Sequence, residues 1–255
     1  MSDRWFEIAS IDHFWVRRRF QVLQRLAGGL IATAGEIAEI GCGHGLLQRQ
    51  IEDAYNRDVT GFDLNETALK QNISQRSRVC CYDILCKNPA LRSIYDVLFL
   101  FDVLEHISDD GAFLKAVQFH LKPSGKLIVN VPAGQWAFSR YDVAAGHVRR
   151  YSLRTLRESV QRSGLSMLEA TYWGFPLVPV LLARKLWPMG MRDNNEVIVA
   201  GFELGRPNIN HAFGILSRCE AIPQTLIGTS LMAVFQSTSA NDQRKDASGS
   251  LIEGR

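Results

Sequence analysis

Apolar and polar positions alternate in two different rhythms along most of this chain. Short apolar runs, typical of buried strands, are separated by segments whose apolar residues recur every three or four positions, which is typical of helices. We expect strands over residues 37–40, 59–62, 79–82, 95–101, 126–131, 165–172 and 228–235. Helices should begin near Leu46 and after Asn65, Asp109 and Ser152, because short polar side chains cap helix N-termini. The helix after Asp109 should stop at Pro123 and Gly125.

This order of elements predicts an α/β fold. Strands that alternate with helices form a parallel, doubly wound sheet, which binds its ligands at the carboxyl ends of the strands. The run 95–101 is apolar at nearly every position, as a central strand covered on both faces should be.

The two ends of the chain and one long segment depart from this rhythm. Residues 1–30 predict a helical lid of one or two helices that end at Gly28-Gly29, followed by a core over 31–172. Residues 173–227 are far too many for a hairpin before the last strand (228–236), so we expect an inserted cap with helices over 177–187 and 210–222. Residues 237–255 predict a disordered tail that ends in a cloning remnant.

The apolar run 175–182 is too short to span a bilayer. A helix at a membrane surface remains an alternative, which we disfavour because apolar faces of such insertions are expected to pack inward.

The charge and the cysteine content argue against a nucleic-acid-binding protein and against a disulfide-bonded or zinc-binding one. The chain has 255 residues, a net charge of +3, 46% hydrophobic and 22% charged residues, which gives no basis for a nucleic-acid partner. Short basic runs such as Arg17-Arg18-Arg19 are expected to be solvated. Five cysteines without C-x-x-C spacing argue against disulfides or a zinc site and favour a reducing cytoplasm.

A glycine-rich turn follows the first predicted strand. Residues 39–45 read Glu-Ile-Gly-Cys-Gly-His-Gly, and a helix follows directly. Glycine permits positive φ and close approach of the backbone to a ligand, and a helix start attracts anionic or oxygen-rich groups. The spacing is neither the dinucleotide G-x-G-x-x-G nor a P-loop, which needs Lys-Ser/Thr.

Two carboxylates end the next strands. Asp63 lies 20 residues beyond the glycines, where a carboxylate accepts hydrogen bonds from ribose hydroxyls, and Asp83 can accept from an adenine amino group. Phe101 and Asp102 end the fourth strand, beneath the reacting end of such a ligand.

Residues 36–132 therefore resemble class I S-adenosylmethionine (SAM)-dependent methyltransferases, with the motif E-x-G-x-G-x-G. The resemblance implies a Rossmann-like sheet of six parallel strands, with an antiparallel seventh between the fifth and sixth. It implies SAM as cofactor and S-adenosylhomocysteine as product. The cofactor-binding residues implied are Glu39, Gly41, Cys42, Gly43 and Gly45, then Asp63 and Leu64 at the ribose, Asp83 and Ile84 at the adenine, and Phe101.

Asp102-Val103-Leu104-Glu105-His106 resembles the D/E-x-x-E-H segment of ubiquinone-pathway O-methyltransferases, some of which are thought to bind a divalent metal through it. The shorter Asp in first place argues against that metal, so we expect none. Glu105 and His106 are instead expected to open a helix and orient the cofactor loop.

The loop beyond the fifth strand lies where a methyl acceptor would enter. His13, Trp15, Trp136, Arg149, Arg150 and Tyr151 are the candidate substrate-binding residues, although the aromatics are equally suited to packing and the arginines to solvation at a helix start. A hydroxyl or acidic carbon acceptor needs a base, for which His147, His106 and Tyr141 are candidates, whereas a neutral amine needs none.

The sequence thus predicts methyl transfer to a small molecule, with oxygen as the first choice of acceptor atom and nitrogen or carbon next. A non-catalytic SAM-binding regulatory protein and a nucleotide-dependent oxidoreductase remain as alternatives. Neither the acceptor nor the oligomeric state follows from the sequence.

Overall fold

The computed structural model of the chain describes residues 10–186 and 207–237. Its strands form one seven-stranded sheet in the order β3-β2-β1-β4-β5-β7-β6. β7 is antiparallel to both β5 and β6, and the remaining neighbours are parallel, so the predicted fold class is confirmed. The strands are β1 (Ile37–Ile40), β2 (Thr60–Asp63), β3 (Val79–Cys81), β4 (Tyr95–Phe101), β5 (Leu121–Pro132), β6 (Leu165–Trp173) and β7 (Ser230–Ser237).

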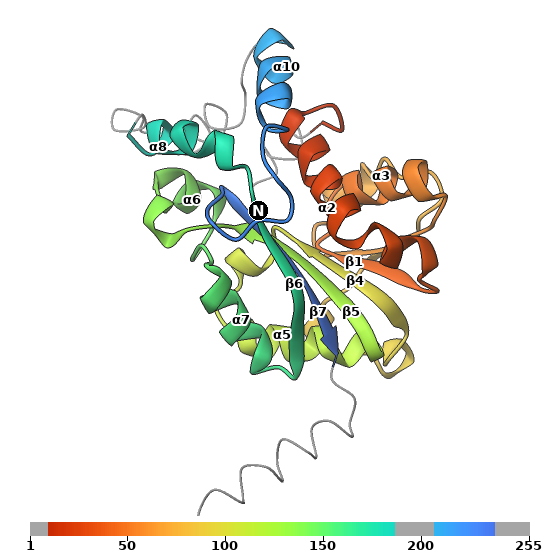
Figure 1. The fold of residues 1–255 in the computed structure, drawn as a ribbon. Helices are drawn as coiled ribbons and strands as arrows, with labels where there is room; N and C mark the ends of the chain where they lie inside the picture. The colour runs from red at the N-terminus through yellow and green to blue at the C-terminus, as the bar shows by residue number, and fades with distance from the viewer. Residues whose placement is uncertain (1–9, 187–206, 238–255) are drawn as a thin grey trace, which may run out of the picture.

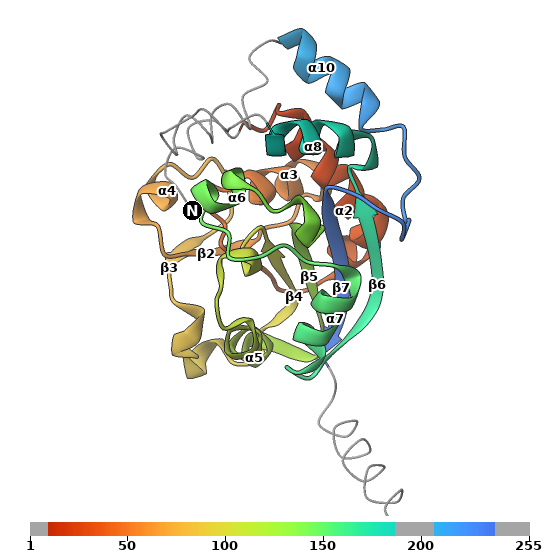
Figure 2. The same cartoon turned by 90° about the vertical axis from the view of Figure 1, so that its left-hand side faces the viewer.

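Helices cover both faces of the sheet (Figures 1 and 2). They are α2 (Phe14–Thr33), α3 (Leu46–Tyr55), α4 (Glu66–Lys70), α5 (Asp110–His120), α6 (Arg140–Ala145), α7 (Leu153–Gln161), α8 (Val178–Leu186) and α10 (Pro207–Leu216). Alternate residues of β4 belong to two different cores. Leu98 and Leu100 pack with α5 and α7, whereas Phe99 and Phe101 pack with α2 and α3. Burial on both faces explains why this strand is a continuous apolar run.

The predicted helix starts are confirmed, but two predicted helix ends are wrong. The side chains of Asn65, Asp109 and Ser152 each accept a backbone N–H in the first turn of α4, α5 and α7. α2 continues through Gly28-Gly29 to Thr33, because Ala27 and Ile31 are buried in the core. A Cβ on Gly28 would lie 2.7 Å from the Tyr55 hydroxyl, so this glycine permits close helix packing rather than a helix end.

Two further boundaries differ at β5, which begins at Leu121 and ends at Pro132. Its pairing with β4 already includes Tyr95 and Leu121, so α5 ends at His120 and not at the expected Pro123. Backbone pairing therefore begins before the apolar run that marked this strand in the sequence.

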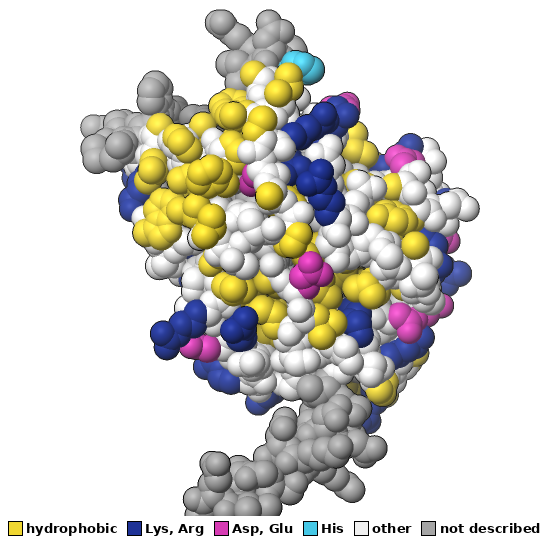
Figure 3. All heavy atoms as spheres, viewed as in Figure 1, with side chains coloured by type: hydrophobic (Ala, Val, Ile, Leu, Met, Phe, Trp, Pro, Cys, Tyr) yellow, Lys and Arg dark blue, Asp and Glu magenta, His cyan; other side chains and the backbone are white. Residues whose placement is uncertain are grey.

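The segment between β6 and β7 carries α8 and α10, which lie beyond the carboxyl ends of the parallel strands (Figure 1). α10 ends at Leu216, before the expected end at Ile222. Leu177 and Leu181 are buried, but Val180, Leu182 and Ile215 are 37–54% exposed, and apolar side chains gather on the surface over α8 (Figure 3). The expected inward packing therefore holds for only part of these apolar residues.

The expectation of a solvated Arg17-Arg18-Arg19 run is wrong for two of its members. Arg18 and Arg19 are 2% and 5% exposed. Arg18 pairs with Glu220 at 3.1 Å, and the same glutamate accepts the backbone N–H groups of Gly174 and Phe175. α2 is thereby tied to both ends of the inserted segment.

Within the described ranges, no helix combines the length and the hydropathy that a membrane crossing requires. The beginning of the predicted lid (residues 1–9), the middle of the predicted cap (187–206) and nearly all of the predicted tail (238–255) lie outside the described residues.

Candidate cofactor and acceptor site

The glycine-rich turn joins β1 to α3 and curls back over β2. Gly41, Gly43 and Gly45 have φ of 76°, 54° and 85°, all in the region that favours glycine. The backbone N–H groups of Gly41 and Cys42 donate to the Phe62 carbonyl at 2.7 and 3.1 Å. A Cβ on Gly41 would overlap the Val103 side chain, so this position tolerates glycine alone.

Asp63 closes the turn from the end of β2. Its Oδ2 accepts the Gly43 N–H at 2.7 Å and its Oδ1 accepts the Asn65 N–H at 2.8 Å. A carboxylate has about four acceptor positions, so each oxygen keeps capacity for a further donor. The side chain is half-buried and lines a cavity.

This cavity, of about 700 Å³, lies at the carboxyl ends of β1, β2, β3 and β4. Of the predicted site residues it brings together Gly41, Asp63, Leu64, Asp83, Ile84 and His106. Glu39, Cys42, Gly43, Gly45 and Phe101 do not line it. Asp102, expected beneath the reacting end of the ligand, also lines it. The lining residues that were not expected at the site are Ile40, Phe62, Asn65, Glu66, Thr67, Tyr82, Val103, Ile107 and Phe113.

Most of these unassigned residues follow a strand by one to six positions, or end it. Most of the lining could therefore be located from the sequence by taking the end of each predicted strand together with the first few residues of the loop that follows it.

The end of β4 is held by a buried polar network. Asp102 has a φ of 56°, and its two carboxylate oxygens accept from Arg19 Nη1 at 2.5 Å and from Asn130 Nδ2 at 2.8 Å. Asn130 in turn accepts from the Trp173 indole N–H at 2.9 Å. The guanidinium of Arg19 lies 5.0 Å from the centre of the Trp15 ring, a cation–π distance.

Glu39 is a buried acid in β1. Burial raises its pKa to about 8, against the attraction of Arg19. Its Oε2 has no hydrogen-bond partner in the described part of the chain, and neither has the Arg19 Nε. A buried acid and a buried base thus each keep one unused polar atom.

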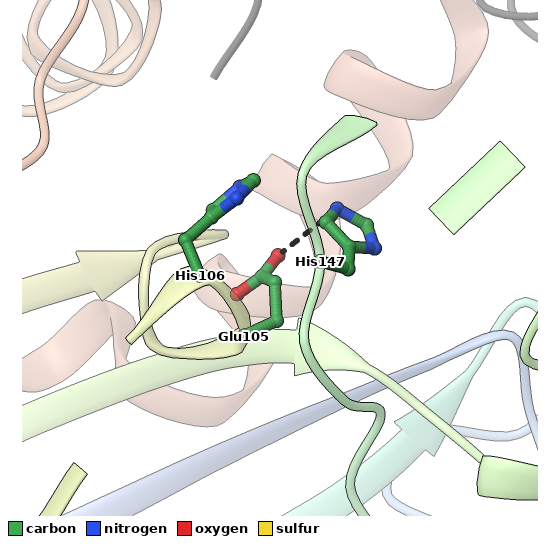
Figure 4. Close-up of side chains that lie close together, drawn as sticks. All are labelled: Glu105, His106 and His147. Carbon is green, nitrogen blue, oxygen red and sulfur yellow. Dashed lines mark ion pairs between the residues drawn. The ribbon is translucent and has the colours of Figure 1, made fainter. Parts of the chain in front are cut away.

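Beside the cavity, Glu105, His106 and His147 form a cluster (Figure 4). One ligand-type atom from each lies within 4.8 Å of the other two. Glu105 and His106 belong to the short 3-10 helix Leu104–His106 after β4, and His147 follows α6. Glu105 lies between the two imidazole rings, whose centres are 4.9 Å apart. The sequence separates these residues by about forty positions and could not show this proximity.

Four further candidates, from α6 and from the segment before α7, form contacts within the protein. Tyr141 and Tyr151 are buried, and the Tyr151 hydroxyl donates to Asp110 at 3.2 Å. Arg150 is buried and pairs with Asp142 at 2.8 Å, while Arg149 pairs with Asp110 at 3.2 Å. These arginines therefore hold the loop together.

Three aromatic candidates lie around α2 and the loop after β5. The His13 imidazole caps α2 by accepting the Trp15 N–H, and Trp15 packs 5.5 Å from Trp173, centre to centre. Trp136 is 44% exposed, and its carbonyl accepts from Lys185 of α8. None of the three lines the cavity at the strand ends.

This architecture, a seven-stranded sheet with a reversed last strand and a ligand cavity behind a glycine turn, defines a Rossmann-like methyltransferase. Comparison with known proteins agrees. Residues 11–170 match a family model described as "Methyltransferase domain", and the chain belongs to that family. The resemblance to SAM-dependent methyltransferases is thereby confirmed.

Among curated relatives, a protein of Mycobacterium tuberculosis named "Probable S-adenosylmethionine-dependent methyltransferase" is 34% identical over 132 residues, which are 51% of this chain and 47% of the relative. A ubiquinone biosynthesis O-methyltransferase of Bordetella avium is 30% identical over 115 residues, 42% of this chain and 46% of the relative. The chain thus spans about half the length of the curated relatives it matches.

Solved structures share the fold. A SAM-dependent methyltransferase from Archaeoglobus fulgidus has a TM-score of 0.56 at 17% identity, covering 86% of this chain and 94% of its own. An N-methyltransferase from Bradyrhizobium japonicum, crystallised with S-adenosyl-L-homocysteine, has a TM-score of 0.54 at 15% identity, covering 89% and 88%.

Proposed function

We propose that this chain transfers a methyl group from SAM to a hydroxyl oxygen of a small molecule. The observation that carries the proposal is the position of one cavity. It is lined by Gly41 of the glycine turn, by Asp63 and Asp83, and by Asp102 and His106 after β4. The residues that we assign to the cofactor and the residue that could accept a proton, His106, therefore line the same cavity.

The residues of the cavity suit the cofactor. Asp63 has spare acceptor capacity for ribose hydroxyls, and Asp83 uses one oxygen to cap the next turn and keeps the other for an adenine amino group. Beneath the turn, the unused Glu39 Oε2 and Arg19 Nε suit the ammonium and carboxylate groups of a methionine portion. SAM supplies an electrophilic methyl group on a sulfonium, so the chain's main tasks are alignment and exclusion of water.

An acceptor hydroxyl must lose its proton, and we assign this step to the cluster beside the cavity. His106 lines the cavity, and its Nε2 has no partner in the described structure. His147 is oriented by Asp142, whose Oδ1 lies 2.9 Å from the His147 Nδ1, in the manner of an acid-oriented base. The buried Tyr141 is the remaining candidate.

We also propose that α2 and the insertion form one lid over the acceptor. The Phe14 N–H donates to Asn210 at 2.8 Å, and the Phe14 and Phe213 rings stack at 5.5 Å. Together with the Arg18–Glu220 pair, these contacts join the N-terminal segment to the insertion far along the chain.

Labelled SAM incubated with a fractionated metabolite extract tests the proposal, with mass identification of the labelled product. The Asp63→Ala variant should give no labelled product at the same SAM concentration. SAM binding without any labelled product would favour the non-catalytic alternative, and tighter binding of NAD than of SAM would favour an oxidoreductase.

A further inference from the structure

The cluster of Glu105, His106 and His147 has a feature that proton transfer alone does not explain. Both histidines bring a ligand-type atom close to the same buried carboxyl group. In each ring Nδ1 is hydrogen-bonded outside the cluster, which leaves Nε2 as the ring nitrogen available to it.

The hydrogen bonds fix the tautomer of each histidine. The His106 Nδ1 lies 3.0 Å from the Gly146 carbonyl, which can only accept, so Nδ1 carries the hydrogen. The His147 Nδ1 lies 2.9 Å from Asp142. Although burial opposes it, hydrogen bonds from His147 and Arg150 lower the pKa of Asp142 to about 2, so this carboxylate is also an acceptor. Both Nε2 atoms therefore keep a lone pair when the rings are neutral.

Glu105 is a buried carboxyl group with no cation in hydrogen-bond contact among the described residues. Its side chain is 1% exposed, and its Oε2 has no hydrogen-bond partner in the described structure. The nearest cationic candidate, the His147 Nε2, is 3.9 Å from Oε1, too far for a hydrogen bond. A buried, unpaired carboxylate is costly, and a cation is the group that would satisfy it.

We propose that Glu105, His106 and His147 bind a divalent transition-metal cation. Two imidazole nitrogens and one carboxylate oxygen, with other positions open, are a donor set typical of Mn²⁺, Fe²⁺ or Zn²⁺. Histidine ligands usually donate their other ring N–H to a carbonyl or carboxylate, as both do here. The proposal revises our expectation that the site holds no metal, and it draws its third ligand from the loop after α6.

Asp102 is not part of this ligand set, because the ligand-type atoms that lie within 4.8 Å of one another belong to Glu105, His106 and His147. The two Asp102 oxygens accept from Arg19 and Asn130 instead. The loop of His147 is held in place by a second contact, because the Val148 N–H donates to the Glu105 carbonyl at 2.8 Å. The chain therefore brings its ligands together before any ion binds.

The metal site itself does not depend on the proposed function. Its role in methyl transfer does rest on that function. With both Nε2 lone pairs given to an ion, neither histidine would accept the proton of the acceptor. The chain's part would then be to hold the cation next to the cofactor cavity, where it could bind an acceptor oxygen. The alternative occupant is a second proton on His147, shared between Asp142 and Glu105.

Titration of the chain with Mn²⁺, followed by loss of the free-ion electron paramagnetic resonance signal, tests the proposal without SAM or acceptor. We expect one ion per chain, a rise in melting temperature with Mn²⁺, and at least tenfold weaker binding in Glu105→Gln and in His147→Gln. His211→Gln is the matched control, because His211 is an exposed histidine on α10, and it should bind as the wild type does. Asp102→Asn should change the affinity by no more than about threefold.

Two results would overturn the metal proposal. One is no binding of Mn²⁺ at millimolar concentration, and the other is equal Mn²⁺ affinity of the wild type and the His147→Gln variant. Those results would leave the histidines as bases and the proposed function intact. Ion binding in a chain that transfers no methyl group would instead contradict the proposed function alone.

Discussion

Arg19 and Asp102 form an ion pair of 2.5 Å between α2 and the end of β4, where Asp102 lines the cavity at the strand ends. Asp102 sits at a positive φ, and burial raises its pKa while Arg19 opposes that rise. Helix α2 thus fixes the backbone of the loop that carries Glu105 and His106. The pair couples the N-terminal helix to the chemistry at the strand ends.

Replacing Arg19 with Leu should lower the free energy of unfolding by about 3–5 kcal/mol, because it leaves a buried carboxylate without its cation. The double variant Arg19→Leu, Asp102→Asn should recover much of this loss, since Asn tolerates positive φ and no charge remains buried. Urea denaturation of the single and double variants measures the coupling. An equal decrease in the free energy of unfolding in the single and the double variant would contradict this. It would show that the Arg19 guanidinium stabilises α2 by packing on Trp15 and not through its ion pair with Asp102.

Asp63→Ala should weaken SAM binding by about 1.5–3 kcal/mol, the range for hydrogen bonds to charged groups. Asp63 also holds the Gly43 N–H, so the variant loosens the turn as well as losing acceptors for ribose. Asp83→Ala should cost less, since one amino group is lost. Calorimetric titration of folded variants provides the measurement, with Asp53→Ala as control because Asp53 is exposed on α3 and pairs with Arg49. Unchanged affinity in Asp63→Ala would contradict the assignment of this residue to the cofactor.

Replacing residues 175–226 with a short turn should abolish methyl transfer and leave SAM binding within about tenfold, if the insertion covers the acceptor. The deletion must carry Arg18→Met, because it removes Glu220 and would leave a buried guanidinium unpaired. Arg18→Met, Glu220→Gln in the full chain is the control and should keep its turnover. A folded deletion variant with normal turnover would show that the insertion has another role.

β1 and β4 could be predicted because each is a buried, mostly apolar run that is followed by glycine or aspartate. Burial on two faces produces such runs, and each run ended close to its observed position. The continuation of α2 through Gly28 could not be predicted, because this glycine serves the approach of Tyr55 from α3 and does not end the helix. Propensity is a weak guide wherever tertiary packing decides.

The candidate site was predictable in its cofactor half and not in its acceptor half. Asp63 and Asp83 follow directly from the ends of strands, so sequence position fixes their place. Arg19 lies 83 residues from Asp102, and His147 lies 41 from His106, and no local pattern reports such distances. Arg150 and Tyr151 were assigned to substrate by their chemistry, but they form internal contacts in the loop.

Glu39 should make the stability of the chain depend on pH between 5 and 8. Its carboxyl group ionises near 4.5 when exposed, whereas burial raises its pKa to about 8 in the folded chain, so the folded state binds more protons in this interval. The protonated Glu39 makes its full contribution to the free energy of unfolding below pH 4.5. This contribution is lost as the pH rises towards 8, by at most about 1.4 kcal/mol per pH unit. The variant Glu39→Gln has the same shape and no such titration.

The difference in free energy of unfolding between wild type and Glu39→Gln should therefore shift in favour of the variant as the pH is raised from 5 to 8. SAM carries positive charge, so its binding should ionise Glu39 and release a proton near pH 7. Calorimetry in two buffers of different ionisation enthalpy measures that proton, and Glu39→Gln should release less. A pH-independent difference between the two proteins, with no buffer dependence of binding, would show that Glu39 is already ionised by Arg19 in the folded chain.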